Sequence, residues 1–244
     1  MKPVLIVIGG TDSSGGAGLS RDITTLTELQ CEARPVITAV TAQTDQAVRA
    51  VAAVPPDHVV QQLSSALATG PVDAIKTGML HSGETVVAVA EILARFATVP
   101  LVIDPVLVSS SGTSLLDPEG VAAIKTHLLP LCTLITPNLP EAAMLTGCEH
   151  PEQQAKTLLE LGAAAVLVKG GHGDGEMSID RLFQSTMPAT EFAAPRLKAS
   201  LRGTGCMLAS AIAANLGTGK SREQACSMAK DFVAHKLKQA SSEI

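Results

Sequence analysis

Short apolar runs alternate with helical patterns along the chain, and this alternation constrains the fold more than any other feature of the sequence. Most of the runs are apolar at consecutive positions and rich in Val, Ile and Leu, as in strands that are buried on both faces of a sheet. Strands that alternate with helices predict a mostly parallel sheet covered by helices on both sides. The predicted strands are residues 4–8, 35–40, 51–54, 72–76, 101–104, 134–136, 165–169, 179–183 and 189–192.

Helical spacing of apolar residues fills the segments between most of these strands. Asp57 and Ser82 are residues of the kind that caps a helix start. The last two strands follow each other closely, which is typical of a hairpin. No repeat or long linker divides the chain, so we predict a single domain over residues 1–244. The predicted helices are residues 23–29, 57–67, 82–93, 118–128, 139–145, 151–161, 204–216 and 222–238.

The composition places the chain among globular proteins and argues against two kinds of partner. Of the 244 residues, 46% are hydrophobic and 17% charged, a balance that supports a buried core rather than disorder. The net charge is −5, and the sequence has four Phe but no Trp or Tyr. Nucleic acids and anionic membranes attract basic proteins, and single-stranded nucleic acids stack on aromatic rings. We therefore expect neither a nucleic acid nor a membrane as a partner.

The five cysteines indicate a reducing compartment. They are scattered and odd in number, with no CxxC pair and no zinc-ligand spacing. The apolar run at residues 4–8 is too short for a signal peptide and ends in Gly9-Gly10, so we interpret it as a first strand. No apolar run reaches the length of a membrane span. We expect a cytoplasmic protein.

A glycine turn before an alanine-rich helix is the most suggestive local motif. Its sequence, Arg202-Gly203-Thr204-Gly205-Cys206, allows backbone N–H groups to converge on one point. The first turn of the helix adds its own unpaired N–H groups and the positive end of its dipole, a combination that favours an anion such as phosphate. At a helix start we also expect the pKa of the Cys206 thiol to fall. The alternative is an ordinary turn in which Cys206 is a small buried apolar residue.

Polar and glycine-rich segments follow the other predicted strands as well. The carboxyl ends of parallel strands meet at one edge of the sheet, where ligands bind in such folds. Two familiar nucleotide motifs do not fit, because residues 9–18 lack the GxGxxG spacing and residues 214–221 lack the first glycine and the strand of a P-loop. We interpret residues 217–221 as the end of one helix and the cap of the next. The segments expected at the edge are residues 9–18, 41–44, 76–79, 104–106, 136–141 and 169–172.

In this order and spacing, the segments resemble the hydroxymethylpyrimidine/phosphomethylpyrimidine kinases of the ribokinase-like superfamily. The resemblance implies a three-layer α/β/α sandwich with a central, mostly parallel sheet. It also implies a homodimer that uses ATP and Mg²⁺ to phosphorylate 4-amino-5-hydroxymethyl-2-methylpyrimidine, and then its monophosphate, in thiamine biosynthesis. The motifs that carry it are Gly15-Gly16-Ala17-Gly18, Thr38-Ala39-Val40-Thr41-Ala42-Gln43, Lys76-Thr77-Gly78-Met79-Leu80, Asp104-Pro105-Val106, Thr136-Pro137-Asn138-Leu139-Pro140-Glu141, Val168-Lys169-Gly170-Gly171-His172 and Gly203-Thr204-Gly205-Cys206.

Two other functions stay open beside this one. A pyridoxal or pyridoxine kinase is related, has the same thiol-containing turn, and acts on a similar ring that carries a hydroxymethyl group. A catalytically idle protein could instead bind the pyrimidine only to sense it. Such a sensor would not need Asn138, Glu141, Lys169 and Cys206, so the presence of all four favours an enzyme.

The resemblance implies roles on the phosphate side and on the ring side of the site. The phosphate side has Gly203, Thr204, Gly205 and Cys206 around the transferred group, Lys169 and Arg202 at ATP phosphates, Asn138 and Glu141 in an Asn-x-x-Glu magnesium pattern, and Asp104 near the metal. The ring side has Gln43 and Asp22 as polar partners, Gly10 and Ala17 at a close backbone approach, and Met79 and Val106 as apolar walls. Cys206 either removes the proton of the acceptor hydroxyl or only positions it.

Several of these residues also have purely structural interpretations. Asn138 and Glu141 can form a helix cap, and both roles can hold together. Asp22 can simply sit on the first helix, and Met79 and Val106 can pack in the core. Asp104 before a proline is a common way to open a turn.

The chain departs from the usual family pattern at several positions. Ser13 replaces a proline, and Ser110 stands where relatives have a lysine. Arg202 and Met207 replace the His and Thr that flank the glycine turn in relatives. Arg202 can supply positive charge in place of the missing lysine. These changes leave kinase chemistry possible but leave the substrate preference and the second phosphorylation open, and His172 fits the pattern without an assigned role.

Overall fold

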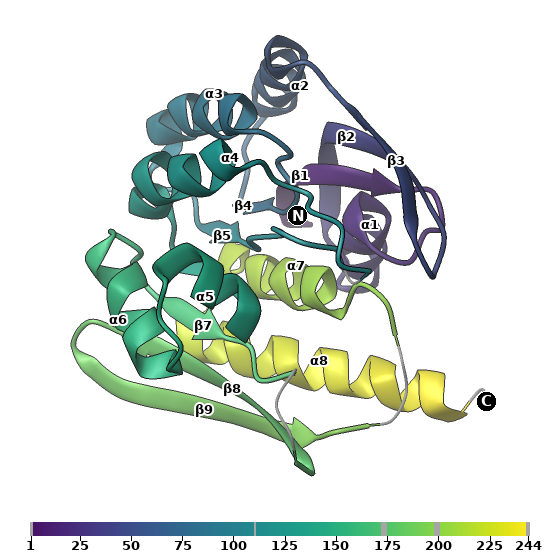
Figure 1. Ribbon diagram of the computed structural model, residues 1–244. Helices are drawn as coiled ribbons and strands as arrows, with labels where there is room; N and C mark the ends of the chain where they lie inside the picture. Colours follow the sequence, from purple (N-terminus) through teal and green to yellow (C-terminus); the bar gives the residue numbers. More distant parts are fainter. Residues whose placement is uncertain (1, 110, 172–174, 198–200, 243–244) are drawn as a thin grey trace.

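A mixed sheet with helices on both faces forms the centre of the molecule (Figure 1). The computed structural model describes residues 2–109, 111–171, 175–197 and 201–242, so Ser110 and His172 lie outside the described residues. Among these residues the sheet has nine strands in the order β3-β2-β1-β4-β5-β6-β7-β8-β9. The expected three-layer α/β/α sandwich is confirmed.

The central strands of the sheet run parallel, and antiparallel strands lie at both edges. The parallel strands are β2 (Glu32–Gln43), β1 (Val4–Asp12), β4 (Ala74–Thr77), β5 (Leu101–Ile103), β6 (Leu134–Ile135) and β7 (Val166–Val168). The antiparallel strands are β3 (Val48–Ala53) beside β2, and the hairpin of β8 (Met177–Gln184) and β9 (Met187–Pro195) beside β7. Each predicted strand, including the hairpin, is present. The carboxyl ends of the parallel strands therefore share one edge, as predicted.

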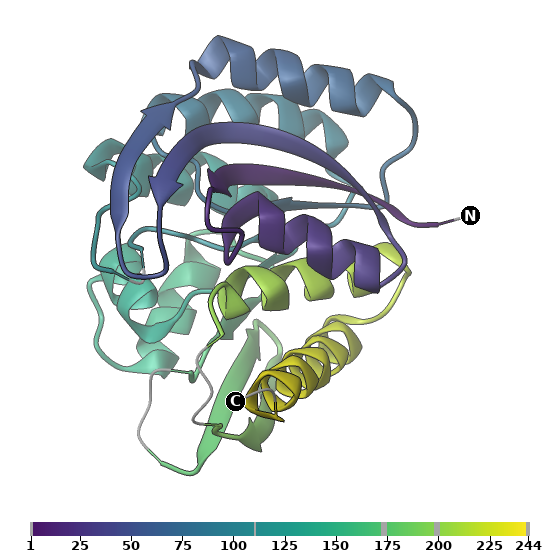
Figure 2. The ribbon, with the colours of Figure 1, turned by 90° about the vertical axis from the view of Figure 1, so that its right-hand side faces the viewer.

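Two layers of helices cover the two faces of the sheet. One face carries α1 (Gly18–Glu28), α7 (Thr204–Gly217) and α8 (Arg222–Ser242), which lie together in Figure 2. The other face carries α2 (Pro56–Ala68), α3 (Gly83–Leu93), α4 (Pro118–Ala123), α5 (Leu139–Thr146) and α6 (Pro151–Glu160). The predicted helices are confirmed in place, with shifts at some of their ends.

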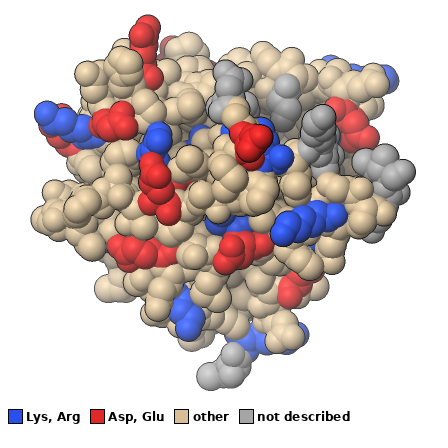
Figure 3. All heavy atoms as spheres, turned by 90° about the horizontal axis from the view of Figure 1, so that it is seen from below, with Lys and Arg blue, Asp and Glu red and all other residues tan. Residues whose placement is uncertain are grey.

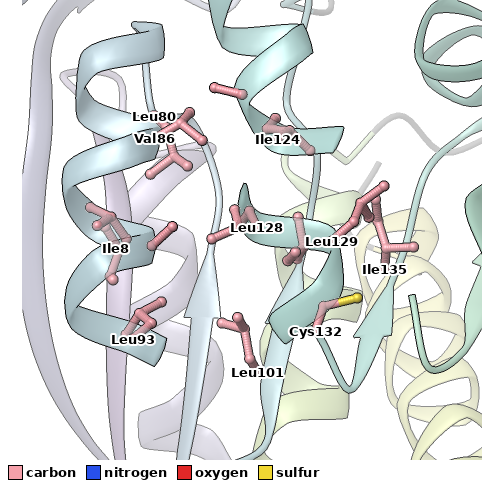
Figure 4. Packing of buried hydrophobic residues seen from close by; sticks show 14 of the residues in the cluster. Ile8, Leu80, Val86, Leu93, Leu101, Ile124, Leu128, Leu129, Cys132 and Ile135 are labelled. Atoms are coloured by element: carbon pink, nitrogen blue, oxygen red, sulfur yellow. The ribbon is translucent and has the colours of Figure 1, made fainter. Parts of the chain in front are cut away.

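Strand β1 shows why the apolar runs of the sequence need helices on both sides. Its side chains alternate in direction, so Leu5 and Val7 pack against the layer of α1 and α7, whereas Ile6 and Ile8 pack against the layer of α2 and α3. All four side chains are fully buried. Burial of each such side chain stabilises the fold by about 1.5–3 kcal/mol relative to exposure. In Figure 4, Ile8 of β1 lies beside Val86 and Leu93 of α3.

Two helix ends differ from the prediction for identifiable reasons. Helix α1 begins at Gly18, five residues before the predicted start, because Asp12 organises the turn ahead of it by accepting hydrogen bonds from the N–H groups of Ser14 and Ala17, both at 2.8 Å. Helix α4 ends at Ala123 and continues as a wider π-helical turn over Ile124–Leu128.

The segment that resembles the tail of a P-loop has the structure that we predicted for residues 217–221. Helix α7 ends at Gly217, and Gly219 has a positive φ of 80°. Ser221 then accepts a hydrogen bond from the N–H of Gln224, whose side chain accepts one from the N–H of Ser221. This reciprocal pair caps the start of α8 and leaves no phosphate-binding loop.

The outer surface has no feature of a membrane-spanning protein among the described residues. Within that part of the chain, every helix is too short or too polar to cross a bilayer. On the face shown in Figure 3, acidic and basic side chains are interspersed. That face therefore carries no broad field of one sign.

Candidate active site

Three charged side chains from separate strand ends meet at the carboxyl edge of the sheet. Lys169 follows β7, Asp104 follows β5, and Glu141 lies in the first turn of α5, which follows β6. The Lys169 Nζ atom is 2.8 Å from Asp104 Oδ1 and 3.8 Å from Glu141 Oε2. These side chains are at most 12% exposed, so water screens their interactions only weakly. A single buried cation is thus held between two carboxyl groups.

The glycine turn before α7 faces the same point as this lysine. Gly203 has a φ of 71°, and a Cβ on it would lie 2.5 Å from the carbonyl oxygen of Gly16, so the position requires glycine. The first backbone hydrogen bond of the helix joins Met207 N to Gly203 O at 2.8 Å. The N–H groups of Thr204, Gly205 and Cys206 precede this bond and have no backbone acceptor among the described residues.

The position of Gly205 shows how closely the turn and the lysine approach each other. A Cβ on Gly205 would lie 3.3 Å from Lys169 Nζ and 3.8 Å from Asp104 Oδ2. The corner is therefore polar and carries a positive charge, rather than being filled with packed hydrocarbon. Amide N–H groups, a helix start and an ammonium group together favour an anion with several oxygens, such as a phosphate.

The charges at this edge shift each other's pKa values. Burial alone would raise the pKa of Asp104, but the ammonium groups of Lys169 and Lys76 outweigh it, so the pKa lies below its usual range. Burial, with some repulsion from Asp104, raises the pKa of Glu141 to about 7 despite the opposing effect of Lys169. Asp104 is therefore the ionised partner of Lys169, and Glu141 titrates near neutral pH.

The thiol of Cys206 behaves differently from the sequence-based expectation. Burial raises its pKa to about 12, and although the ammonium of Lys76 lowers it, the carboxyl groups of Asp22 and Asp104 raise it further. The N–H of Gly18 has a smaller lowering effect. The expected fall of the pKa at the helix start is wrong for this chain, because burial outweighs the helix start. At neutral pH the thiol keeps its proton and can act as a weak hydrogen-bond donor.

Asn138 and Glu141 form the helix cap that the sequence allowed. Asn138 Oδ1 accepts a hydrogen bond from the Glu141 N–H, and Glu141 Oε2 accepts one from the Asn138 N–H, both at 2.8 Å. The other carboxyl oxygen of Glu141 has no hydrogen-bond partner among the described residues. The cap thus fixes the side chain and leaves Oε1 available for a ligand.

The expected ring-side residues lie around a small apolar cluster. Met79 and Val106 pack with Ala39 and Leu115 in this cluster. A Cβ on Gly10 would lie 2.8 Å from Met79 Sδ, so the Met79 side chain packs closely over the backbone of β1 at this glycine.

Two further ring-side residues are near the N-terminal turn. Gln43 is the last residue of β2, and it is half-buried. Its side chain and that of Ser14 lower the pKa of Asp12 against the effect of burial. The N–H of Ala17 is bound to Asp12 Oδ2 at 2.8 Å. Gln43 therefore faces the turn that Asp12 organises.

Asp22 has the second of its two predicted positions, inside the fold on the first helix. It is fully buried, and its carboxyl oxygens accept hydrogen bonds from Lys76 Nζ at 2.8 and 2.9 Å and from Ser210 Oγ at 2.8 Å. With these partners it has no oxygen facing a ring substrate, which argues against the amino-group contact. Nothing local in the sequence identifies Lys76 as its partner, although a lysine inside a doubly buried strand needs one.

The side chain of Arg202 contacts the N-terminal part of the site. Its Nη1 atom is 2.5 Å from Ser14 Oγ and 3.0 Å from Asp45 Oδ1, and its Nη2 atom is 3.4 Å from Asp12 Oδ2. Its charge is thus paired within the chain, in contrast to the expected position at the phosphates. These partners could not be predicted from the sequence, because Ser14 and Asp45 lie more than 150 residues away from Arg202 along the chain.

Ser13, in the turn after β1, binds the end of the neighbouring strand β2. Its Oγ atom accepts a hydrogen bond from the Gln43 N–H and donates one to the Gln43 carbonyl oxygen, both at 2.9 Å. With the Arg202–Asp45 pair, it ties the tip of the β2–β3 hairpin to the turn after β1.

Comparison with known proteins gives one consistent family. The family model described as phosphomethylpyrimidine kinase matches residues 12–243. The hydroxymethylpyrimidine/phosphomethylpyrimidine kinase of Escherichia coli is 40% identical over 242 residues, covering 96% of this chain and 91% of that protein. The thiamine biosynthesis bifunctional protein ThiED of Geobacter sulfurreducens is also 40% identical, but this chain spans only 49% of its length.

Solved structures of two kinds of kinase share the fold of this chain. Phosphomethylpyrimidine kinase from Clostridium difficile superposes with a TM-score of 0.84 at 33% identity, covering 97% of this chain and 100% of that one. The pyridoxal kinase from Staphylococcus aureus in complex with pyridoxal has a TM-score of 0.88 at 32% identity, covering 98% and 88%. Likeness of fold therefore does not separate the pyrimidine from the pyridoxal reaction.

Proposed function

Because the chain belongs to the phosphomethylpyrimidine kinase family, we propose that it transfers a phosphoryl group from ATP to the hydroxymethyl group of 4-amino-5-hydroxymethyl-2-methylpyrimidine, and then to the resulting monophosphate. The reaction would serve thiamine biosynthesis, to which the name of the half-matched bifunctional relative also refers. The ribokinase-like fold and the kinase family are the premises of this proposal.

One observation carries the proposal beyond the family match. Lys169 Nζ would lie 3.3 Å from a Cβ on Gly205, at the unpaired N–H groups of the first turn of α7. Phosphoryl transfer needs stabilisation of charge on the equatorial oxygens of the moving group, and fixed amides with a cation supply it. Gly203, Thr204 and Gly205 would hold those oxygens, and Lys169 would pair with an ATP phosphate.

The acceptor hydroxyl must lose its proton as the phosphoryl group arrives. Cys206 lies beside the phosphate-binding amides, but its raised pKa makes it a poor proton acceptor at neutral pH. We therefore assign it the positioning role, as a neutral donor or a packing surface for the hydroxymethyl group. Gln43 would read the pyrimidine edge, because an amide both donates and accepts hydrogen bonds. Met79 and Val106 would form the apolar walls.

The residues present fit a magnesium ion that is held mainly by its substrate. Among the described residues no three His, Cys, Asp or Glu side chains are arranged to enclose a metal. Asp104 and Glu141 nonetheless offer carboxyl oxygens beside Lys169, with Oε1 of Glu141 uncommitted. Mg²⁺ characteristically takes one or two carboxylates, water and substrate phosphates, and it neutralises phosphate charge. We propose Glu141 and Asp104 as its protein partners and Asn138 as the residue that orients Glu141.

The pyridoxal reaction is the second candidate. Its support is the TM-score of 0.88 to a pyridoxal kinase in complex with pyridoxal, together with the departures of this chain at Ser13 and Arg202. Both reactions would use the same phosphate corner. A third possibility is a non-catalytic pyrimidine sensor. It is less well supported, because a sensor of the ring would not need Lys169 beside the phosphate-binding amides.

A coupled assay of ADP production tests these functions against one another. The purified protein is supplied with ATP, Mg²⁺ and one ring compound at a time: the pyrimidine alcohol, its monophosphate, or pyridoxal. We expect the highest kcat/KM with the pyrimidine alcohol. A higher kcat/KM with pyridoxal would replace the proposal by its alternative, and tight pyrimidine binding with no ADP production would indicate the sensor.

We also propose a cytoplasmic homodimer. The support for the compartment is chemical, since each of the five cysteines is a free thiol. The homodimer rests on the resemblance to the family alone. Sedimentation of the purified protein would test it, and a monomer at micromolar concentration would contradict it.

A further inference from the structure

A fully buried group of three polar side chains lies below the candidate active site. It consists of Asp22 on α1, Lys76 on β4 and Ser210 on α7, and we call it the buried clamp. Lys76 Nζ lies 2.9 and 2.8 Å from the two carboxyl oxygens of Asp22, and Ser210 Oγ donates to Asp22 Oδ1 at 2.8 Å. The side chains of Asp22 and Lys76 are 0% and 1% exposed. The clamp therefore joins two helices and a central strand in the interior.

Each member of the clamp follows or precedes, by one helical turn or by two strand residues, a residue in one of the turns that form the site. Ser210 is four residues after Cys206 on α7, and Asp22 is four residues after Gly18 on α1. Four residues are about one turn of helix, or roughly 6 Å along its axis. Lys76 lies in β4 two residues before Gly78, which is the first residue after the strand. The clamp thus links the elements that carry the N-terminal turn, the turn after β4 and the phosphate-binding turn.

The ammonium of Lys76 lies directly under the site. A Cβ on Gly78 would be 2.9 Å from Lys76 Nζ, so the ammonium contacts the turn that follows β4. An ammonium group has three N–H donors, and its hydrogen bonds to described residues all go to the carboxylate of Asp22. Burial alone would lower the pKa of Lys76, but the charge of Asp22 outweighs it and raises the pKa. Burial raises the pKa of Asp22, although Lys76 and the hydrogen bond from Ser210 act against that rise.

A gain in the stability of the fold does not explain why Asp22 and Lys76 are buried as a pair. Removing two charges from water costs several kcal/mol per ion, and apolar side chains of similar volume often stabilise a fold as well or better. The surrounding α7 layer is apolar, with Ala209, Ala211 and Ile212 fully buried beside Ser210. Directional bonds instead fix the distance and orientation of the three elements, which apolar packing specifies less sharply.

We propose that Asp22, Lys76 and Ser210 are positioning residues that hold the three turns of the site in register for phosphoryl transfer. None of them touches the reacting atoms in this arrangement; they act through Gly18, Gly78 and Cys206. The inference rests on the proposed kinase function. Transfer rates respond steeply to the placement of reacting groups, and a misplacement of about 1 Å can cost on the order of 100-fold.

The first part of the test replaces the clamp by apolar side chains in one protein, K76M with D22L. This double variant removes both charges together, so neither is left buried alone. We expect kcat to fall on the order of 10- to 100-fold while the KM values change less, in a protein that stays folded at the assay temperature. The variant S210A, which removes only one hydrogen bond, should lower kcat in the same direction by a smaller factor.

The matched control is T25V, which removes another buried hydroxyl from α1. Thr25 donates to the Arg21 carbonyl oxygen within its own helix and takes no part in the hydrogen bonds of the clamp. We expect T25V to keep the kcat of the parent protein even where its Tm falls. A purely structural clamp would make kcat per folded molecule the same in all of these variants, and that result would overturn the proposal.

A second readout needs no substrate and separates this inference from the assigned reaction. Amide hydrogen exchange should become faster in peptides that cover residues 15–18, 76–80 and 203–207 of S210A and of the double variant, but not of T25V. If no ring compound is phosphorylated, faster exchange still supports the clamp, whereas the proposed function fails. If the parent protein is active, and S210A and the double variant have the same exchange rates and the same kcat as the parent, the positioning role of the clamp is refuted while the proposed function stands. If the double variant does not fold, S210A decides by the same two measurements.

Discussion

Lys169 and Asp104 form an ion pair across a strand that lies between their own strands. Lys169 follows β7 and Asp104 follows β5, while β6 separates the two in the sheet. The pair is nevertheless only 2.8 Å long, with side chains 12% and 3% exposed. A bridge of this kind fixes the lysine over the carboxyl edge, next to the amides that begin α7. The first prediction follows from this geometry.

Replacement of Lys169 by Met should damage both turnover and stability. The loss of the ammonium leaves Asp104 buried with its nearest cation removed, which costs about 3 kcal/mol or more of the free energy of unfolding. Loss of the phosphate partner should lower kcat on the order of 100-fold. Urea unfolding and the ADP assay measure the two effects.

The control for this variant is K230M. Lys230 forms an ion pair of equal length with Asp180, and its side chain is similarly buried, at 11% exposed. K230M should lose stability yet keep most of its turnover, because Lys230 bonds to Ser178 and Asp180 on β8 and not to the residues of the phosphate corner. Equal losses of kcat in the two variants would contradict the phosphate role of Lys169.

Cys206 should act as a neutral thiol rather than as a base. Its pKa of about 12 leaves it protonated at neutral pH, so iodoacetamide should label it slowly at pH 7–8 and faster only at higher pH. C206A should lower kcat by about tenfold and the affinity for the ring compound less, and C206S should lose less than C206A. Losses above about 100-fold in both variants would instead indicate proton abstraction.

The sequence predicted the framework of this molecule well because its signals are local. Runs such as residues 4–8 are apolar at each position, and only a sheet covered on both faces buries them. The place of Lys169 and Asp104 at one edge followed from parallel strands alone. The glycine turn before α7 was found because Gly203 and Gly205 mark it in the sequence.

Pairings between distant segments could not be predicted in the same way. Asp22 and Lys76 are 54 residues apart, and nothing local shows that one neutralises the other. Arg202 looked available for phosphate because its partners, Asp12 and Asp45, belong to the opposite end of the chain. The pKa of Cys206 was misjudged because burial by tertiary packing outweighs the helix start.

We expect Glu141 to lower the stability of the folded protein above pH 7, although its carboxylate is needed for turnover. Its pKa of about 7 in the folded protein exceeds the ordinary value of 4.5, so the folded state binds its proton more tightly than the unfolded state. Its favourable contribution is therefore present below pH 4.5 and is lost as the pH rises toward 7. E141Q should be more stable than the parent protein at pH 8, with a smaller difference at pH 4.5, and each kcal/mol gained raises Tm by about 2–4 °C.

The same substitution should lower turnover, since a neutral amide is a poorer partner for Mg²⁺ than a carboxylate. Glutamine can still accept the hydrogen bond from the Asn138 N–H, so the helix cap stays in place. Thermal unfolding at the two pH values and the Mg²⁺ dependence of kcat test this prediction. An E141Q protein that is less stable at pH 8 than the parent would contradict it.

Arg202 should serve the N-terminal turn rather than the nucleotide. R202A breaks the contacts to Ser14, Asp45 and Asp12, and should free the tip of the β2–β3 hairpin next to Gln43. We expect the KM for the ring compound to rise several-fold while the KM for ATP stays within about twofold, as for a partly exposed ion pair outside the phosphate corner. D45N removes only the exposed partner and should have a weaker effect of the same kind. A larger change for ATP than for the ring would restore the phosphate role.

Substitution of Gly205 by alanine should lower turnover without lowering the stability of the fold. It lies in the first turn of α7, where alanine is the better helix former by up to about 1 kcal/mol, so G205A should be at least as stable as the parent protein. The new methyl group would nevertheless stand 3.3 Å from Lys169 Nζ, in the space where the phosphate oxygens would lie. We expect kcat/KM for ATP to fall on the order of 100-fold with an unchanged or raised Tm. G203A should instead lose stability, because its Cβ meets the Gly16 carbonyl oxygen at 2.5 Å. An active G205A protein would mean that the phosphoryl group passes elsewhere, and the assignment of this corner would fail with it.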